Sequence, residues 1–125
     1  MEKLAFINEQ LNNVLNIPYQ LGQWTSDVTY PYFVGEFAEE PTSTEDGYEA
    51  STLLITGFHR GEMLDLEEAK AKIKKHFDPI FGLRAKTDSG SIAVFYNGAY
   101  FVPTGEKNLK RIEINLSIKE WKGVF

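Results

Sequence analysis

The most regular segment of the sequence reads Arg111-Ile112-Glu113-Ile114-Asn115-Leu116-Ser117-Ile118-Lys119. Apolar and polar residues alternate along it without a break. Successive side chains of a strand point to opposite faces, so this pattern predicts a strand with one packed face and one polar face. The packed face needs a cover of helices. Its predicted residues are Ile112, Ile114, Leu116 and Ile118.

Two amphipathic helices are predicted to provide that cover. Apolar residues recur at helical spacing from Leu4 to Leu15, and Pro18 ends this helix because the residue before a proline is pushed out of the α region. A second helix is predicted to begin with Asp65 as its cap, and Glu68 completes a capping-box pattern. The apolar stripe of this helix consists of Leu66, Ala69, Ile73 and Phe77.

Three further strands are predicted from aromatic and β-branched residues, over residues 30–37, 50–58 and 91–103. Asn97-Gly98 lies inside the last of them and fits either a hairpin turn or a bulge in one long strand. The predicted fold is α+β, a single domain over residues 1–125 in the order α-β-β-α-β-β. Its sheet is of the antiparallel type, with four or five strands and both helices packed on one face.

Composition limits the class of protein. The chain has 125 residues, 42% of them hydrophobic, which suits one domain with an adequate core. It has no cysteine, which excludes disulfides and thiolate metal sites. The first residues do not resemble a secretory signal, and no apolar stretch is long enough to span a membrane. We therefore expect a soluble protein made in a cytoplasm, with no membrane partner.

The negative charge is concentrated in one segment. From Ala38 to Glu49 there are five acidic residues and no basic one, so the other 13 of the 18 acids balance the 13 Lys and Arg. A general nucleic-acid binder would carry a basic surplus instead. The segment is also rich in Thr, Ser, Pro and Gly, which predicts a long and mobile polar loop. Its acids are Glu39, Glu40, Glu45, Asp46 and Glu49.

Residues with catalytic or ligand-binding potential are few. His59, Glu62 and Asp65 lie near one another in sequence, but their spacing does not match that of a metal site, and a turn and a helix cap explain the two acids. There is no Gly-x-Ser-x-Gly elbow and no glycine-rich phosphate loop. We predict that the protein is not an enzyme and binds no cofactor or metal.

Interface residues are predicted from surface character alone. Tyr and Trp are enriched in protein interfaces, and an aromatic segment at residues 121–125 is unusual for a chain end. The acidic loop is the other candidate. The predicted interface residues are Tyr30, Tyr32, Glu39, Glu40, Glu45, Asp46, Trp121 and Phe125.

Three segments carry a resemblance to a known family. They are Tyr32-Phe33-Val34-Gly35-Glu36, the segment from Ala50 to Phe58, and the segment from Leu109 to Trp121. Together with the order of elements they resemble the tail terminator, or tail completion, proteins of long-tailed bacteriophages and prophages. The resemblance covers nearly the whole chain and rests on element order and strand texture, without a catalytic motif.

The resemblance implies a structural protein of the virion tail without enzymatic activity. It implies a ring, six copies of the chain, that caps the tail tube and meets the head–tail connector. DNA would pass through the ring without specific binding. Head–tail joining proteins and tube subunits are related alternatives. From another class, a stand-alone cytoplasmic module whose acidic loop binds a basic partner remains open, and so does a small enzyme that uses the His59 region.

Overall fold

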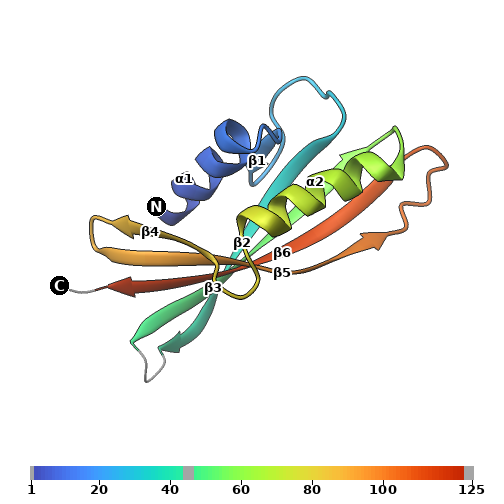
Figure 1. Ribbon diagram of the computed structural model, residues 1–125. Coiled ribbons are helices and arrows are strands. Elements are labelled where there is room, and N and C mark those ends of the chain that lie inside the picture. The colour runs from blue at the N-terminus through green and yellow to red at the C-terminus, as the bar shows by residue number, and fades with distance from the viewer. Residues whose placement is uncertain (1, 44–46, 123–125) are drawn as a thin grey trace.

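The computed structural model describes residues 2–43 and 47–122. Its main feature is one sheet with the strand order β1-β2-β3-β6-β5-β4 (Figure 1). Neighbouring strands pair antiparallel, except that β1 pairs parallel with β2. The strands are β1 (Tyr19–Leu21), β2 (Tyr32–Ser43), β3 (Tyr48–His59), β4 (Leu83–Thr87), β5 (Gly90–Val102) and β6 (Lys110–Lys122).

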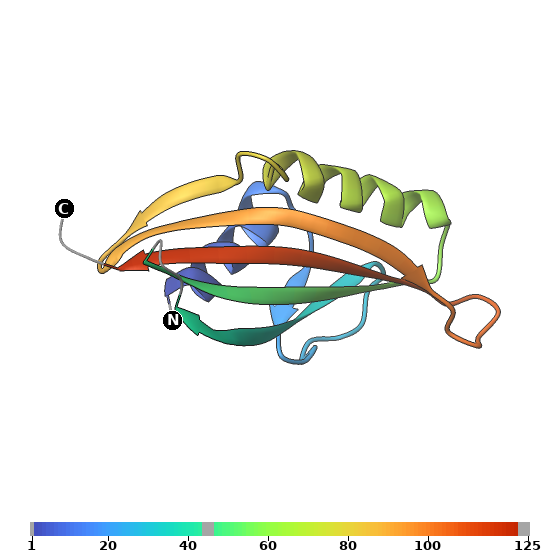
Figure 2. The same cartoon turned by 90° about the horizontal axis from the view of Figure 1, so that it is seen from below.

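The predicted fold class is therefore wrong in its sheet. The structure is mostly sheet, with six mixed strands instead of four or five antiparallel ones, and they curl into an open half-barrel (Figure 2). The long strands twist along their length, which bends the whole sheet. β1 is parallel because it enters directly after the first helix, without a hairpin, and Phe33 N donates to Pro18 O at 2.9 Å.

Both helices pack against the same side of the sheet (Figure 1). The first is α1 (Glu2–Glu9), which continues into a π-helical stretch over Gln10–Val14; the second is α2 (Met63–His76). The cap prediction for α2 is wrong, because Glu62 occupies the N-cap and Asp65 lies in the first turn. Among the described residues, neither helix is long and apolar enough to cross a membrane.

One core joins the helices to the sheet. Ile112, Ile114, Leu116 and Ile118 are completely buried, and they share this core with Leu66, Ile73 and Phe77 of the α2 region. The predicted packed face of the last strand is confirmed. α1 contributes Leu4 and Ile7 to the same core, and the π-helical stretch contributes Leu11.

The predicted acidic loop is largely a β-hairpin. β2 extends to Ser43 and β3 begins at Tyr48, so residues 38–43 and 48–49 belong to strands. Pro41 lies where the pairing of β2 with β3 shifts register, a position at which a residue without an N–H is tolerated. Glu45 and Asp46 lie outside the described residues.

The two alternatives for Asn97-Gly98 are now resolved. β5 is one strand, and its register with β6 shifts between Tyr96 and Ala99, so the pair forms a bulge. Gly98 has φ 105°, a conformation that favours glycine. Tyr96 and Ala99 both belong to the helix-covered side of the sheet, packed against its core.

Tyr19 of β1 supports a prediction about alkaline stability. Its ring is 3% exposed and covers Gly35, where an added Cβ would lie 2.1 Å from the phenol oxygen. Burial raises the pKa of Tyr19 to about 12. The folded state keeps the neutral phenol while the unfolded chain loses the proton near pH 10, so this stability is full below pH 10 and is lost as the pH rises through 12. We expect Tyr19 to account for about 2 kcal/mol of lost unfolding free energy at pH 11.5.

Urea unfolding between pH 9 and pH 11.5 measures this loss. The variant Tyr19→Phe keeps the ring and removes the titrating group, so its stability should fall less over the same range. Equal pH dependence of the two proteins would show that another group is responsible.

Candidate interaction surface

The sheet face turned away from the helices is the candidate functional surface. Along β3 and β6 its side chains alternate with the core residues, and polar and apolar groups are mixed on it. That mixture is typical of surfaces that associate after folding. Its central residues are Thr52, Leu54, Thr56, Glu113, Asn115 and Ser117.

An aromatic group lies at one end of this face, and we call it the Tyr32 cluster. Tyr32 stacks on Phe58, its partner across β2 and β3, with 5.3 Å between ring centroids. Trp24 and Tyr30 lie 5.0 and 5.7 Å from Tyr32. Arg60 packs over Tyr30 at 5.6 Å, and its Nε donates to the Tyr30 hydroxyl at 3.1 Å. Trp, Tyr and Arg are the side chains that most often dominate binding energy.

A second aromatic group, the Trp121 cluster, lies at the other end of the same strands. Tyr48 faces Trp121 across β3 and β6, with ring centroids 5.8 Å apart. Lys119 Nζ lies 4.9 Å from the centroid of Tyr48 and 5.5 Å from that of Phe95. β3 runs from Tyr48 to Phe58, so about 33 Å separate the two clusters at the usual rise per residue.

A polar triad completes the face. Tyr100 donates its hydroxyl to Glu113, and Arg111 pairs with the other carboxylate oxygen. The hydrogen bond from Tyr100 and the charge of Arg111 lower the pKa of Glu113 from its usual value. The same hydrogen bond raises the pKa of Tyr100. The triad therefore holds a buried carboxylate in its charged form on an otherwise open sheet.

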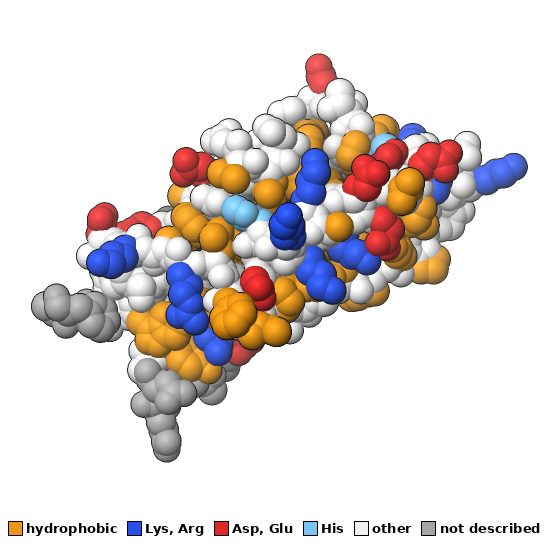
Figure 3. Space-filling view, viewed as in Figure 1, with side chains coloured by type: hydrophobic (Ala, Val, Ile, Leu, Met, Phe, Trp, Pro, Cys, Tyr) orange, Lys and Arg blue, Asp and Glu red, His pale blue; other side chains and the backbone are white. Residues whose placement is uncertain are grey.

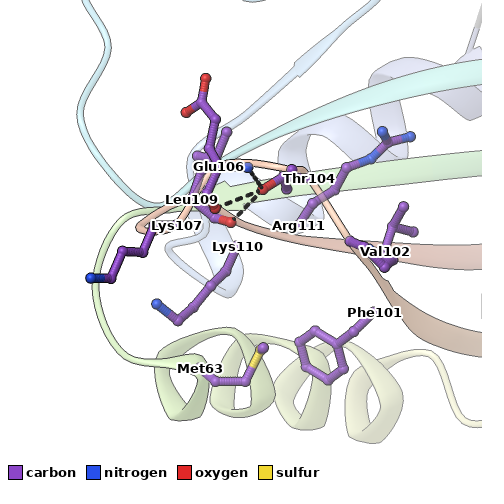
Figure 4. Close-up of a pocket in the computed structure, with 11 residues that line it drawn as sticks. Met63, Phe101, Val102, Thr104, Glu106, Lys107, Leu109, Lys110 and Arg111 are labelled. Carbon is purple, nitrogen blue, oxygen red and sulfur yellow. Dashed lines mark hydrogen bonds between the residues drawn. The ribbon is translucent and has the colours of Figure 1, made fainter.

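A pocket of about 570 Å³ lies between the β5–β6 loop and the start of α2 (Figure 4). Met63 and Phe101 lie beside each other on its α2 side. Thr104 shapes the loop, since its hydroxyl accepts from Glu106 N at 3.1 Å and lies 2.8 Å from Leu109 O. Its lining combines apolar side chains with four charged ones, which are Glu106, Lys107, Lys110 and Arg111.

The structure brings His59 and Asp65 together. His59 Nε2 lies 2.8 Å from Asp65 Oδ2, and the histidine is 7% exposed. Glu62 is exposed and makes no cap hydrogen bond. In residues 2–43 and 47–122 no three His, Cys, Asp or Glu side chains are grouped so that they could hold a metal ion. The pair fastens the start of α2 to the end of β3.

The predicted interface residues do not form one site. Tyr30 and Tyr32 lie together in the Tyr32 cluster, while Trp121 lies at the opposite end of the face. Glu39 and Glu40 are exposed near the far end of β2. Phe125, like Glu45 and Asp46, lies outside the described residues.

Sequence reasoning missed several members of the clusters. Phe58 and Tyr48 occupy positions of even spacing along one predicted strand, so the period of two could have placed them on one face with Leu54. Trp24 comes from the β1–β2 connection, which carries no such signal. Arg60 reaches the cluster only because β2 and β3 pair in the observed register.

On the side that carries α2, acidic and basic side chains are interspersed (Figure 3). This surface has no continuous basic field of the kind that binds nucleic acid. No model of a protein family matches the chain, and no curated protein matches it.

Proposed function

We propose that the chain is a structural protein of a bacteriophage or prophage, a tail terminator. In this proposal six copies form a ring on the finished tail tube, and the ring also meets the head–tail connector. The protein acts in the virion tail after assembly in the host cytoplasm, and it catalyses no reaction. The resemblance of the three strand segments supports the family, and the surface supports assembly.

The observation that carries the proposal is the pair of aromatic clusters. The Tyr32 cluster and the Trp121 cluster lie at opposite ends of one helix-free sheet face, and each is already packed in the free chain. Two contact regions at opposite ends of one subunit suit a ring that meets one partner on each side, the tube and the connector.

The charge supports the passage of DNA through the ring. The net charge is −5, and the acidic surplus lies in the segment from Ala38 to Glu49. An acidic opening repels the phosphate backbone, so DNA passes without being held. The same acids would serve a stand-alone module that binds a basic partner, and the tube experiment separates the two functions.

The test uses tail-tube subunits from the same genome. Purified protein is added while the subunits polymerise, and tube ends are imaged by electron microscopy. We expect growth to stop and a ring of density to sit on the tip. Tubes that keep growing with bare ends would reject the terminator function.

Two variants then ask whether the clusters make the contacts. Tyr32→Ala and Trp121→Ala each remove a central aromatic ring, and we expect the variant whose cluster faces the tube to need about 30-fold more protein for capping. Val14→Ala is the matched control, because Val14 is 52% exposed on the helical layer, away from the sheet face. Melting curves confirm that all three variants fold. Unchanged capping by both cluster variants would place the contacts elsewhere.

A further inference from the structure

The sheet ends in two edges that no other strand covers in the described part of the chain. β1 pairs with β2 only from Phe33 to Gly35, which leaves β2 open from Glu36 onward. β4 pairs with β5 alone. In Figure 2 these two strands lie at opposite margins of the sheet. Open edges present unpaired backbone groups and are templates for pairing with another chain.

The two edges carry opposite charge. Glu36, Glu39 and Glu40 of β2 are exposed, and no described basic side chain forms an ion pair with them. Arg84 and Lys86 of β4 are also exposed, and neither pairs with a described carboxylate; Arg84 Nε donates to Phe81 O at 3.2 Å. One edge is therefore acidic and the other basic.

We propose that the open β2 edge of one copy pairs with the β4 edge of the next copy, so that the sheet continues from subunit to subunit. Four antiparallel pairings separate β2 from β4, so the two strands run in the same direction. Copies related by rotation about an axis along the strands would thus pair these edges in parallel, as β1 and β2 already do.

The edge charges disfavour two-fold contacts between identical edges. A two-fold contact between two β2 edges would set Glu36, Glu39 and Glu40 against their own copies. A two-fold contact between two β4 edges would set Arg84 and Lys86 against theirs. Like charges directly opposite are unfavourable, whereas opposite charges across a strand pair stabilise it. The edges therefore select a head-to-tail contact, which is the kind that closes into rings.

Because side chains alternate between the two faces of a strand, the pairing of β2 with β4 can shift only in steps of two residues. Phe37 and Ala85 both pack against the core on the helix-covered side, so Glu36 and Arg84 both point to the open face. β1 already pairs with β2 as far as Gly35, so β4 of the next copy must lie beyond it. With Arg84 beside Ala38, between Glu36 and Glu40, Leu83 lies beside Phe37 and Lys86 lies beside Glu40. A slip of one residue would turn the apolar residues of one strand against the charges of the other.

This inference rests on the proposed ring only for the number of copies, because the edge contact is testable without a tube. The chain has no cysteine, so single cysteines report on one contact. Chains with Ala38→Cys and with Arg84→Cys are mixed at high concentration under mild oxidation. Adjacent strands bring Cα atoms within disulfide range, so we expect mixed disulfide dimers. The control pairs Arg84→Cys with Ser117→Cys, which lies on the inner strand β6.

The outcomes separate the contact types. A mixed 38–84 dimer in clear excess over the control supports the proposal. Excess of 38–38 or 84–84 dimers would show two-fold contacts and overturn it, and so would yields equal to the control. Normal tube capping by a protein that fails to form the 38–84 link would reject the edge contact and leave the terminator function standing. The link without capping would reject the terminator function alone.

Reversing the charges of one edge tests whether they direct the association. Arg84→Glu/Lys86→Glu makes both edges acidic, and Glu36→Lys/Glu40→Lys makes both basic. Each variant alone should associate with itself about tenfold more weakly than the natural chain, as measured by sedimentation at low salt. Mixed together, the two variants should regain association, because each basic edge again meets an acidic one. Equal association of the separate variants and the mixture would show that edge charge does not direct the contact.

Discussion

Replacing Lys3 by Met is expected to lower the free energy of unfolding by about 3–5 kcal/mol, because it leaves the carboxylate of Glu120 buried without its cation. Lys3 is 7% exposed and Glu120 8%, and Lys3 Nζ lies 3.1 Å from Glu120 Oε1. The ammonium group also lies 5.2 Å from the ring centroid of Phe37. The pair therefore ties α1 to β6 and β2 at once. Urea unfolding at pH 7 measures the loss.

Two controls identify the buried charge as the cause. Lys3→Met together with Glu120→Leu removes both charges, and its stability should return to near that of the natural chain, because a buried ion pair is often no better than apolar residues of similar volume. Lys70→Met breaks the more exposed pair with Glu67, 2.9 Å apart, and should lower stability by less than about 1 kcal/mol. A Lys3→Met loss as small as that of Lys70→Met would contradict the prediction.

The ion pair shows what sequence reasoning cannot reach. Lys3 and Glu120 are separated by 117 positions, and nothing in their neighbourhoods distinguishes them from exposed charges. The segments that were predicted correctly carry long periodic patterns. α2 and β6 repeat an apolar residue at helical or alternate spacing over many residues, and such repetition outweighs local exceptions.

The two short strands were missed for physical reasons. β1 has three residues and forms only because the chain after Pro18 runs beside β2. β4 has five residues and is flanked by glycines at positions 82 and 90. A strand of that length forms because a partner strand is present, so its own residues give little sequence signal. Both strands lie at margins of the sheet, which is why the predicted strand number was too small.

The acidic segment was misjudged because composition outweighed pairing. Polar and turn-forming residues favour a loop, yet Glu39 pairs with Ser51 and Ser43 with Glu49 in the hairpin. β2 and β3 continue as paired strands beyond the hydrophobic residues of each. For the surface, single aromatic residues were identified, but their grouping into two clusters depends on strand register, which the sequence does not provide.

Truncation of Ile114 or Leu116 to Ala is expected to lower the free energy of unfolding by about 2–5 kcal/mol, through lost burial and the cavity that remains. Both side chains are completely buried in β6, where Ile114 pairs with Ile55 and Leu116 with Leu53. β6 lies between β3 and β5, so the cavity would open in the middle of the sheet, where neighbours on both sides are fixed by ladders and cannot move in. Thermal and urea unfolding measure the effect.

Asn115→Ala is the matched control on the same strand, because Asn115 is half-buried on the open face between the two core residues. It should change stability by no more than about 0.5 kcal/mol, as a surface substitution does. Ile114→Val removes one methylene and should fall between the two, at about 0.5–1.5 kcal/mol. If Ile114→Ala and Leu116→Ala melted like the natural chain while Asn115→Ala did not, the packed face of β6 would be the one that carries the two clusters, and the helices would cover the opposite side of the sheet.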